Sequence, residues 1–172
     1  MLLNSIPSGS TIVNIFMQNP ERYMMLLSFA QNILRKDSFL SVPERETIAA
    51  FTSSLNKCKF CTGSHRVFAI SVGADELELD KIINQNYSDI KIAPILDYVK
   101  KLTLTPSELT EEDVKKVYNG GYSEDELKDA IAICAAFNMF NRLVEGHGIE
   151  ENIHTWLPSA EDINMFGYDR GK

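Results

Sequence analysis

The sequence predicts an all-α fold, for two reasons. Apolar residues recur at helical spacing along most of the 172 residues, and the boundaries between these stretches carry residues that typically start or end helices. In contrast, no segment shows the Val, Ile and Thr alternation, bounded by hairpin-turn residues, that is typical of a strand with one exposed face. We therefore expect a helical bundle.

The helix boundaries in the first half are marked by proline and glycine. Pro20 and Pro43 both suit the first turn of a helix, where no backbone donor is needed, so we expect helices to begin there. Gly73 follows an apolar run and is typical of the left-handed residue that ends a helix. Asp75 can then cap another short helix.

The second half combines periodicity with capping residues. From Ser88 to about Leu104, apolar residues fall at spacings of three and four, as one buried helix face requires. Thr110 and Ser123 are each followed three positions later by an acidic residue, a pattern typical of a helix start. We expect the next two helices to begin directly after these caps.

The chain is most simply a single domain, residues 1–172, with a core at 20–150. The last long helix, 125–144, is apolar on nearly all sides, so it is either central to the core or buried in a subunit interface. We expect the C-terminal tail, 151–172, to be irregular and to dock on the core or on a neighbouring subunit, because it carries apolar residues such as Trp156. These features favour a homo-oligomer.

Composition excludes several classes of partner. The net charge of −7, spread over the chain, argues against nucleic-acid binding, which needs clustered Lys and Arg. No run approaches the roughly 18 consecutive apolar residues of a membrane span, so we expect no membrane partner. The N-terminal residues do not follow a signal-peptide pattern, and we expect a cytoplasmic protein.

The most informative motif is the stretch NKCKFCTGSH. Cys58 and Cys61 form a CxxC pair, and His65 follows four residues later. On a helix the three side chains share one side, and His65 stacks one turn after Cys61. A thiol beside a base or at a helix N-terminus has a lowered pKa, so a chain break near Asn56 and Lys57 would place both cysteines at the electropositive end of a helix.

A histidine that acts as a base needs an acceptor to orient its other nitrogen. Glu46 lies twelve residues before Cys58, roughly 18 Å along an unbroken helix, and reaches the motif only if the chain turns near Asn56. The residues alone do not select Glu46 over Glu44 or Glu21.

The same cysteines and histidines are also compatible with two other kinds of site. Cys58, Cys61 and His65 could bind zinc with His147 or His154 as a fourth ligand, although structural zinc sites usually draw on two separate segments. A thioredoxin-like fold would place the CxxC after a strand, and no strand is predicted.

Residues outside the motif have simpler explanations. Cys134 lies in an apolar run and is best explained as a small buried residue, whereas His147 and His154 are most simply surface residues or partners of a helix C-terminus. Asn138 and Asn141 in the last long helix are expected to be satisfied hydrogen-bond partners.

The CxxC motif and the residues around it resemble a known protein family. The stretch VPERETIAAFTSSLNKCKFCTGSHRVFAISVGAD resembles the core of the carboxymuconolactone decarboxylase-like superfamily, in its alkylhydroperoxidase D-like, CxxC-bearing branch. The intervals between Glu46, Cys58, Cys61 and His65 match the pattern of that branch. The segment LTEEDVKKVYNGGYSEDELKDAIAICAAFNMFNRLVEGHGI is similar to the peroxidase-related members, so that the resemblance covers about residues 20 to 150.

The resemblance implies an all-helical chain, assembled as trimers or hexamers, that reduces hydroperoxides with thiols and without haem, flavin or metal cofactor. It also implies that Cys61 attacks the peroxide, Cys58 resolves the sulfenic acid as a disulfide, and His65 and Glu46 relay protons. The implied reductant is a dithiol donor of dihydrolipoyl or thioredoxin type. Phe60 stands where the best-known member has a histidine.

Two alternative functions use the same residues. One is a disulfide reductase in which Cys58, nearer the helix start, attacks. The other is a redox-sensing or zinc-stabilised oligomer without enzymatic activity. Lactone decarboxylation is a further possibility by superfamily name only, because that chemistry does not need a CxxC.

Overall fold

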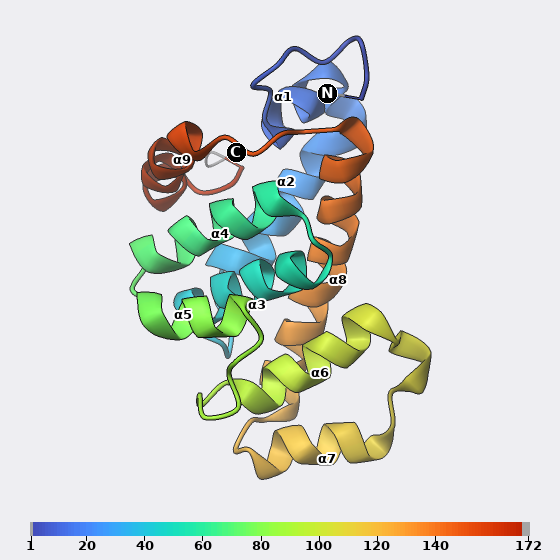
Figure 1. Ribbon diagram of the computed structural model, residues 1–172, viewed down its shortest axis with the longest axis vertical. Coiled ribbons are helices and arrows are strands. Elements are labelled where there is room, and N and C mark those ends of the chain that lie inside the picture. The colour runs from blue at the N-terminus through green and yellow to red at the C-terminus, as the bar shows by residue number, and fades with distance from the viewer. Residues whose placement is uncertain (1, 170–172) are drawn as a thin grey trace.

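The computed structural model describes residues 2–169, and every regular element in that range is a helix (Figure 1). The predicted all-α fold is therefore confirmed. The elements are α1 (Ile12–Gln18), α2 (Pro20–Arg35), α3 (Val42–Leu55), α4 (Lys59–Ser71), α5 (Glu76–Ile83), α6 (Ala93–Leu104), the short 3-10 helix η1 (Pro106–Glu108), α7 (Glu111–Asn119), α8 (Glu124–His147) and α9 (Ile153–Phe166).

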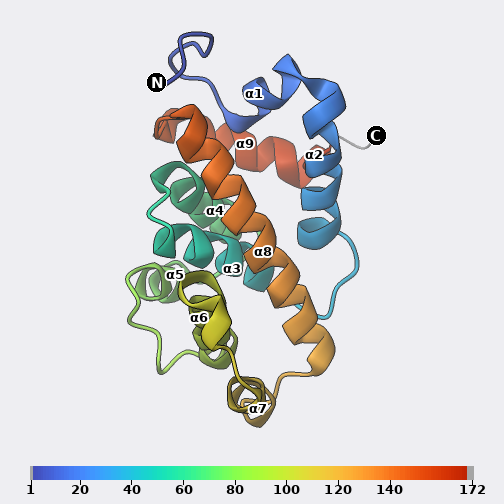
Figure 2. The ribbon, with the colours of Figure 1, turned by 90° about the vertical axis from the view of Figure 1, so that its right-hand side faces the viewer.

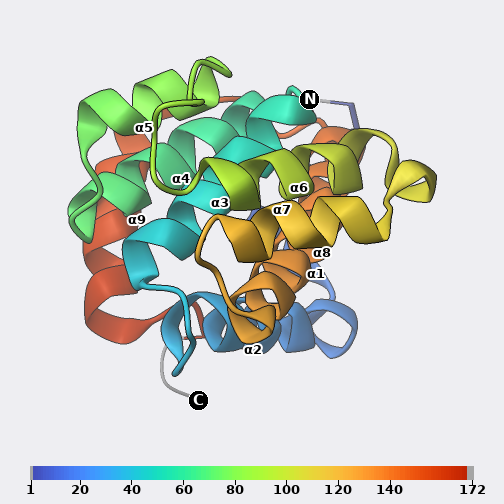
Figure 3. The same cartoon turned by 90° about the horizontal axis from the view of Figure 1, so that it is seen from below.

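The centre of the bundle is the pair α3 and α4, which pack closely along each other. The long helix α8 runs diagonally across them and also contacts α2 and α6 (Figure 2). Helices α6 and α7 lie side by side at the end of the molecule opposite α1 (Figures 1 and 3). None of the helices in the described range is both long and apolar enough to cross a membrane.

The helix starts follow the predicted capping chemistry. Pro20 and Pro43 lie in the first turns of α2 and α3. Reciprocal hydrogen bonds between the cap and the acidic residue three positions later are formed at Ser41, Thr110 and Ser123. These bonds satisfy backbone donors that would otherwise lack a partner.

Two local predictions need correction. Helix α6 begins at Ala93 rather than Ser88, because Pro94 has no N–H and is tolerated only in the first turn of a helix. The C-terminal tail, predicted to be irregular, forms helix α9, which packs against α4. Its local signals are weak, with Pro158 inside the helix, and packing on α4 supplies the missing stability. Residues 170–172 of the expected tail lie outside the described residues.

Candidate active site

The turn between α3 and α4 brings the two halves of the motif together. Lys57 adopts a left-handed backbone conformation, with φ of 58°, and Cys58 becomes the N-cap of α4. The Asn56 side chain donates hydrogen bonds to Asn138 Oδ1 at 3.1 Å and to Asn141 Oδ1 at 2.9 Å. The turn is thereby tethered to α8, and both asparagines of α8 are hydrogen-bonded, as predicted.

The two motif cysteines lie at the buried N-terminus of α4. Cys58 is fully buried and Cys61, in the first turn, is 5% exposed; both are free thiols. A hydrogen bond with the Cys61 side chain, followed by burial, raises the pKa of the Cys58 thiol far above its usual value. Cys58 therefore retains its proton.

Glu46 and His65 face each other across the α3–α4 contact. His65 Nδ1 lies 2.6 Å from Glu46 Oε2, and the carboxylate is fully buried. Burial by itself would raise the pKa of Glu46, but contacts with His65, Arg35 and Tyr168 together hold that pKa below its usual value. An ionised carboxylate only accepts hydrogen bonds, so Nδ1 of His65 carries a proton and donates it, which leaves Nε2 available.

The structure separates Glu46 from the other glutamates considered. Glu44, two residues earlier, accepts hydrogen bonds from the backbone and hydroxyl of Ser41 and so serves as part of the α3 cap. Glu21 lies in the first turn of α2 and is exposed. Of the three, only Glu46 contacts His65.

Two further residues contact Glu46 and were missed by sequence reasoning. Arg35, in the last turn of α2, forms an ion pair with Glu46 Oε1, and the Tyr168 hydroxyl donates to the same oxygen at 2.7 Å. Arg35 is best explained from the sequence as a partner of the helix C-terminus. Tyr168 lies 122 positions from Glu46, and no local pattern connects them.

Aromatic rings enclose His65 on several sides. Phe137 and Phe68 approach it edge-on, with ring centroids at 4.5 and 5.1 Å, and Tyr168 stacks on it at 6.3 Å. Side chains on a helix lean towards its N-terminus, and Cys61 lies one turn before His65 in α4. The arrangement combines a thiol pair, an imidazole and a buried carboxylate, and so it can transfer protons away from bulk water.

The remaining cysteine and histidines lie outside this cluster. Cys134 is fully buried, its sulfur lies 3.2 Å from the Thr103 hydroxyl, and burial raises the pKa of its thiol. His147 Nδ1 contacts the Leu143 carbonyl oxygen at 2.6 Å near the end of α8, and His154 is exposed. Within residues 2–169 no group of three or more His, Cys, Asp or Glu side chains is arranged to hold a metal ion.

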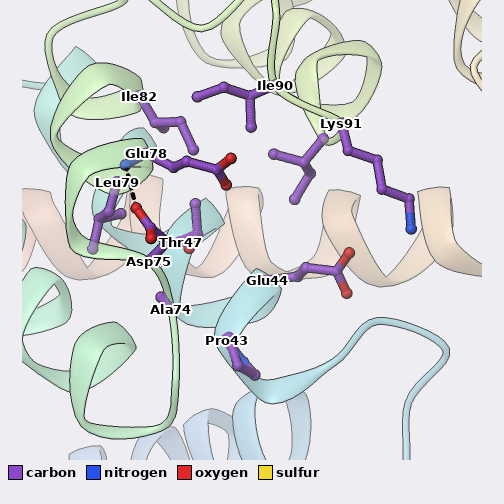
Figure 4. Close-up of a pocket in the computed structure, with 11 residues that line it drawn as sticks. Pro43, Glu44, Thr47, Ala74, Asp75, Glu78, Leu79, Ile82, Ile90 and Lys91 are labelled. Carbon is purple, nitrogen blue, oxygen red and sulfur yellow. Dashed lines mark hydrogen bonds between the residues drawn. The ribbon is translucent and has the colours of Figure 1, made fainter.

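A separate hollow of about 200 Å³ lies between the start of α3, helix α5 and residues 90–92 (Figure 4). Leu79 and Ile82 line it together with the charged side chains of Glu44, Glu78 and Lys91. None of its lining residues belongs to the thiol, histidine and glutamate cluster. The hollow is therefore distinct from the candidate active site.

Comparisons with known proteins agree with this geometry. Residues 20–98, which include both motif cysteines, His65 and Glu46, match the family described as "Carboxymuconolactone decarboxylase family". A solved structure described as an alkylhydroperoxidase AhpD core, an uncharacterized peroxidase-related protein from Ralstonia eutropha JMP134, is 25% identical; the match covers 83% of this chain and 77% of that one, with a TM-score of 0.76. Over residues 20–98 the chain matches this family, and the solved AhpD-like structure supports the same superfamily.

Two more solved structures share the fold of this chain. An uncharacterized peroxidase-related protein from Silicibacter sp. TM1040 is 23% identical over 85% of this chain and 78% of that one, with a TM-score of 0.77. A protein of unknown function from Agrobacterium tumefaciens is 18% identical over 83% of this chain and 99% of that one, with a TM-score of 0.68. No curated protein sequence matches the chain.

Proposed function

We propose that this protein is a thiol-dependent peroxidase with an antioxidant role. The Cys61 thiolate attacks the terminal oxygen of a hydroperoxide, the O–O bond breaks, and Cys61 becomes a sulfenic acid while an alkoxide leaves and takes up a proton. The Cys58 thiol then displaces water from the sulfenic acid and forms the Cys58–Cys61 disulfide. A dithiol donor of dihydrolipoyl or thioredoxin type reduces the disulfide and is itself oxidised.

The observation that carries this proposal is the buried Glu46–His65 contact, one helical turn from Cys61. His65 holds its Nδ1 proton against Glu46, so Nε2 can accept the Cys61 proton and later deliver it to the leaving alkoxide. Neither step needs a cofactor, because the electrons come from the two thiols. The peroxidase-related protein from Ralstonia eutropha, at 25% identity, supports the same reaction class.

The assignment of roles to the two cysteines rests on their different environments. The raised pKa of Cys58 suits a resolving thiol that keeps its proton until the sulfenic acid has formed. A disulfide reductase led by Cys58 would instead need an exposed thiol with a lowered pKa, and Cys58 is fully buried. The structure therefore favours Cys61 as the attacking thiol.

The direct test is a count of free thiols on the reduced protein before and after a slight excess of an organic hydroperoxide. We expect two of the three thiols to be lost for each peroxide consumed. Cys58→Ser should react once and retain a sulfenic acid, and Cys61→Ser should not react. Cys134→Ser is the matched control and should still lose two thiols, because Cys134 is buried away from the pair.

Survival of both motif thiols in the presence of peroxide would contradict the proposed reaction. If such protein still catalysed the exchange of a disulfide substrate with dihydrolipoamide, the reductase alternative would replace it.

The proposal includes assembly into trimers or hexamers in a reducing, cytoplasmic setting. Exposed apolar residues on α9, among them Leu157 and Phe166, are available to such an interface. Sedimentation equilibrium would give the oligomeric state, and a monomer across the micromolar range would contradict this part.

A further inference from the structure

The two oxygens of the Glu46 carboxylate have different partners. Oε2 faces His65 Nδ1 at 2.6 Å, whereas Oε1 accepts from Arg35 and from the Tyr168 hydroxyl at 2.7 Å. His65, and after it Arg35, supply the positive charge that lowers the pKa of Glu46. A second donor on the same oxygen restricts rotation of the carboxylate, so that Oε2 stays directed at His65.

The chain that carries Tyr168 is held at several points. Asn164 donates to the Ser71 hydroxyl at 2.9 Å, which fixes the end of α9 to the end of α4. Gly167 then takes a positive φ of 76°, and a Cβ at this position would meet the Gln31 side chain at 2.5 Å. The Tyr168 backbone N–H donates to Gln31 Oε1 at 2.8 Å, which ties this turn to α2. The positive φ and the close approach of Gln31 make the turn depend on glycine.

The Tyr168 ring also fits its surroundings. The ring stacks on His65 with an interplanar angle of 15°. The Arg35 guanidinium lies over the Tyr168 ring, 5.0 Å from the ring centroid, and makes a cation–π contact. Burial, and then the neighbouring Glu46 charge, raise the pKa of Tyr168 well above its usual value, so the hydroxyl keeps the proton that it donates. The residue therefore contacts both Glu46 and His65, the two groups that precede Cys61 in the proposed relay.

We propose that Tyr168 is a positioning residue of the active site: its hydroxyl holds Glu46 so that His65 is oriented towards Cys61. This inference rests on the proposed function, because it concerns the same relay. Tyr168 acts through Glu46 and His65 and does not itself touch the reacting sulfur. The C-terminal segment after α9 thus completes a site whose other proposed members lie at residues 46–65.

The test compares Tyr168→Phe, which removes only the hydroxyl, with Tyr168→Ala, which also removes the ring. Both are made in a chain that carries Cys58→Ser and Cys134→Ser, so that Cys61 is the single thiol. The alkylation rate of Cys61 by iodoacetamide is measured against pH. The midpoint reports the pKa of Cys61 and the plateau rate reports its accessibility. Tyr118→Phe is the matched control, since Tyr118 is exposed and belongs to α7, which lies at the end of the bundle opposite α1 (Figure 1).

We expect the midpoint of Tyr168→Phe to rise by about 0.5 to 1 pH unit, because a less ordered Glu46 stabilises the His65 imidazolium less well and the Cys61 thiolate loses part of its partner's charge. Tyr168→Ala should show the same rise together with a faster plateau, and Tyr118→Phe should match the parent. With both motif cysteines restored, Tyr168→Phe should consume hydroperoxide more slowly at neutral pH and recover at higher pH.

An unchanged or lowered midpoint in Tyr168→Phe would overturn the inference, even if Tyr168→Ala shifted it, because the effect would then belong to the ring and not to the hydroxyl. The midpoint is measured without peroxide. Failure of the parent chain to consume hydroperoxide would therefore overturn the proposed function and leave the positioning result to be judged separately.

Discussion

The α3–α4 pair and the C-terminal segment, residues 153–169, contribute to the same buried cluster in different ways. Helix α3 buries ten of its 14 residues, whereas α9 buries only Ala160. The first element is therefore held by the core itself, and the second by a few specific contacts. The reactive groups thus lie on core helices, whereas Tyr168, which contacts Glu46, lies on a segment that is held by few contacts.

The contacts made by the two regions also differ in range. The N-cap and the first two turns of α4 carry Cys58, Cys61 and His65. A single turn at Lys57 brings Glu46 close to this part of α4. The C-terminal segment reaches the same carboxylate from the other end of the chain, through Tyr168. Damage to α3 should thus affect folding, whereas damage to α9 should affect mainly the surroundings of the site.

The largest expected effect comes from Glu46→Ala. The change leaves the Arg35 guanidinium without its buried counter-charge, so we expect a loss of about 3–5 kcal/mol in the free energy of unfolding, measured with urea. Glu44→Ala on the same helix is the control and should cost about 1 kcal/mol, because it removes only a capping contact. Equal losses of stability in the two variants would show that the Arg35–Glu46 ion pair does not stabilise the fold more than a helix cap does.

A second expected effect is a loss of stability in acid. The pKa of Glu46 is lowered in the folded chain, so the folded state binds fewer protons there than the unfolded state. Its contribution is complete above the ordinary Glu value of about 4.3 and is lost as the pH falls through the lower, folded value. Unfolding by urea across this range should show a weaker pH dependence in Glu46→Gln. An identical slope in both chains would assign the acid sensitivity to other carboxylates.

A smaller effect is expected where α9 docks. A Cβ at Gly63 would lie 2.0 Å from the ring of Trp156, so Gly63→Ala forces α9 away from α4. The clash outweighs the helix propensity that alanine gains, with a net loss of about 1–2 kcal/mol. Because Trp156 is the single tryptophan, its fluorescence should shift to the red.

Gly146→Ala is the matched control for this change. It also lies in a helix, and a Cβ there has no described atom within 4 Å, so the emission should not move. An unshifted emission in Gly63→Ala would mean that the α4–α9 contact tolerates the methyl group.

The smallest effect concerns the turn itself. The left-handed conformation of Lys57 is strained because the residue has a Cβ. Lys57→Gly should therefore stabilise the chain by up to about 1 kcal/mol in thermal or urea unfolding. Peroxide consumption should stay unchanged. Lys59→Gly, at the first residue of α4, should have the opposite sign, with a loss of up to about 1 kcal/mol. Destabilisation by both changes would indicate that the Lys57 side chain itself supports the turn.

Much of the fold could be predicted from the sequence. The starts of α2, α3, α7 and α8 follow from proline and capping residues, and these act within four positions along the chain. Helix α9 could not be predicted in this way, because Pro158 lies inside it and its stability comes from packing on α4. The prediction that His65 lies one turn after Cys61 rests on helical spacing alone, and α4 contains both residues.

From local spacing and backbone chemistry, the sequence predicted the all-α class, most helix starts and the placement of Cys61 and His65 one turn apart, whereas Cys58 precedes α4 as its N-cap. The choice of Glu46 over Glu44 came from the resemblance in spacing to a known family, and the structure showed its physical reason in the contact with His65. The contacts of Arg35 and Tyr168 with this carboxylate, and the burial of the thiols, are visible in the tertiary structure alone. Such contacts join segments far apart in the chain, and packing between helices, not local sequence, brings them together.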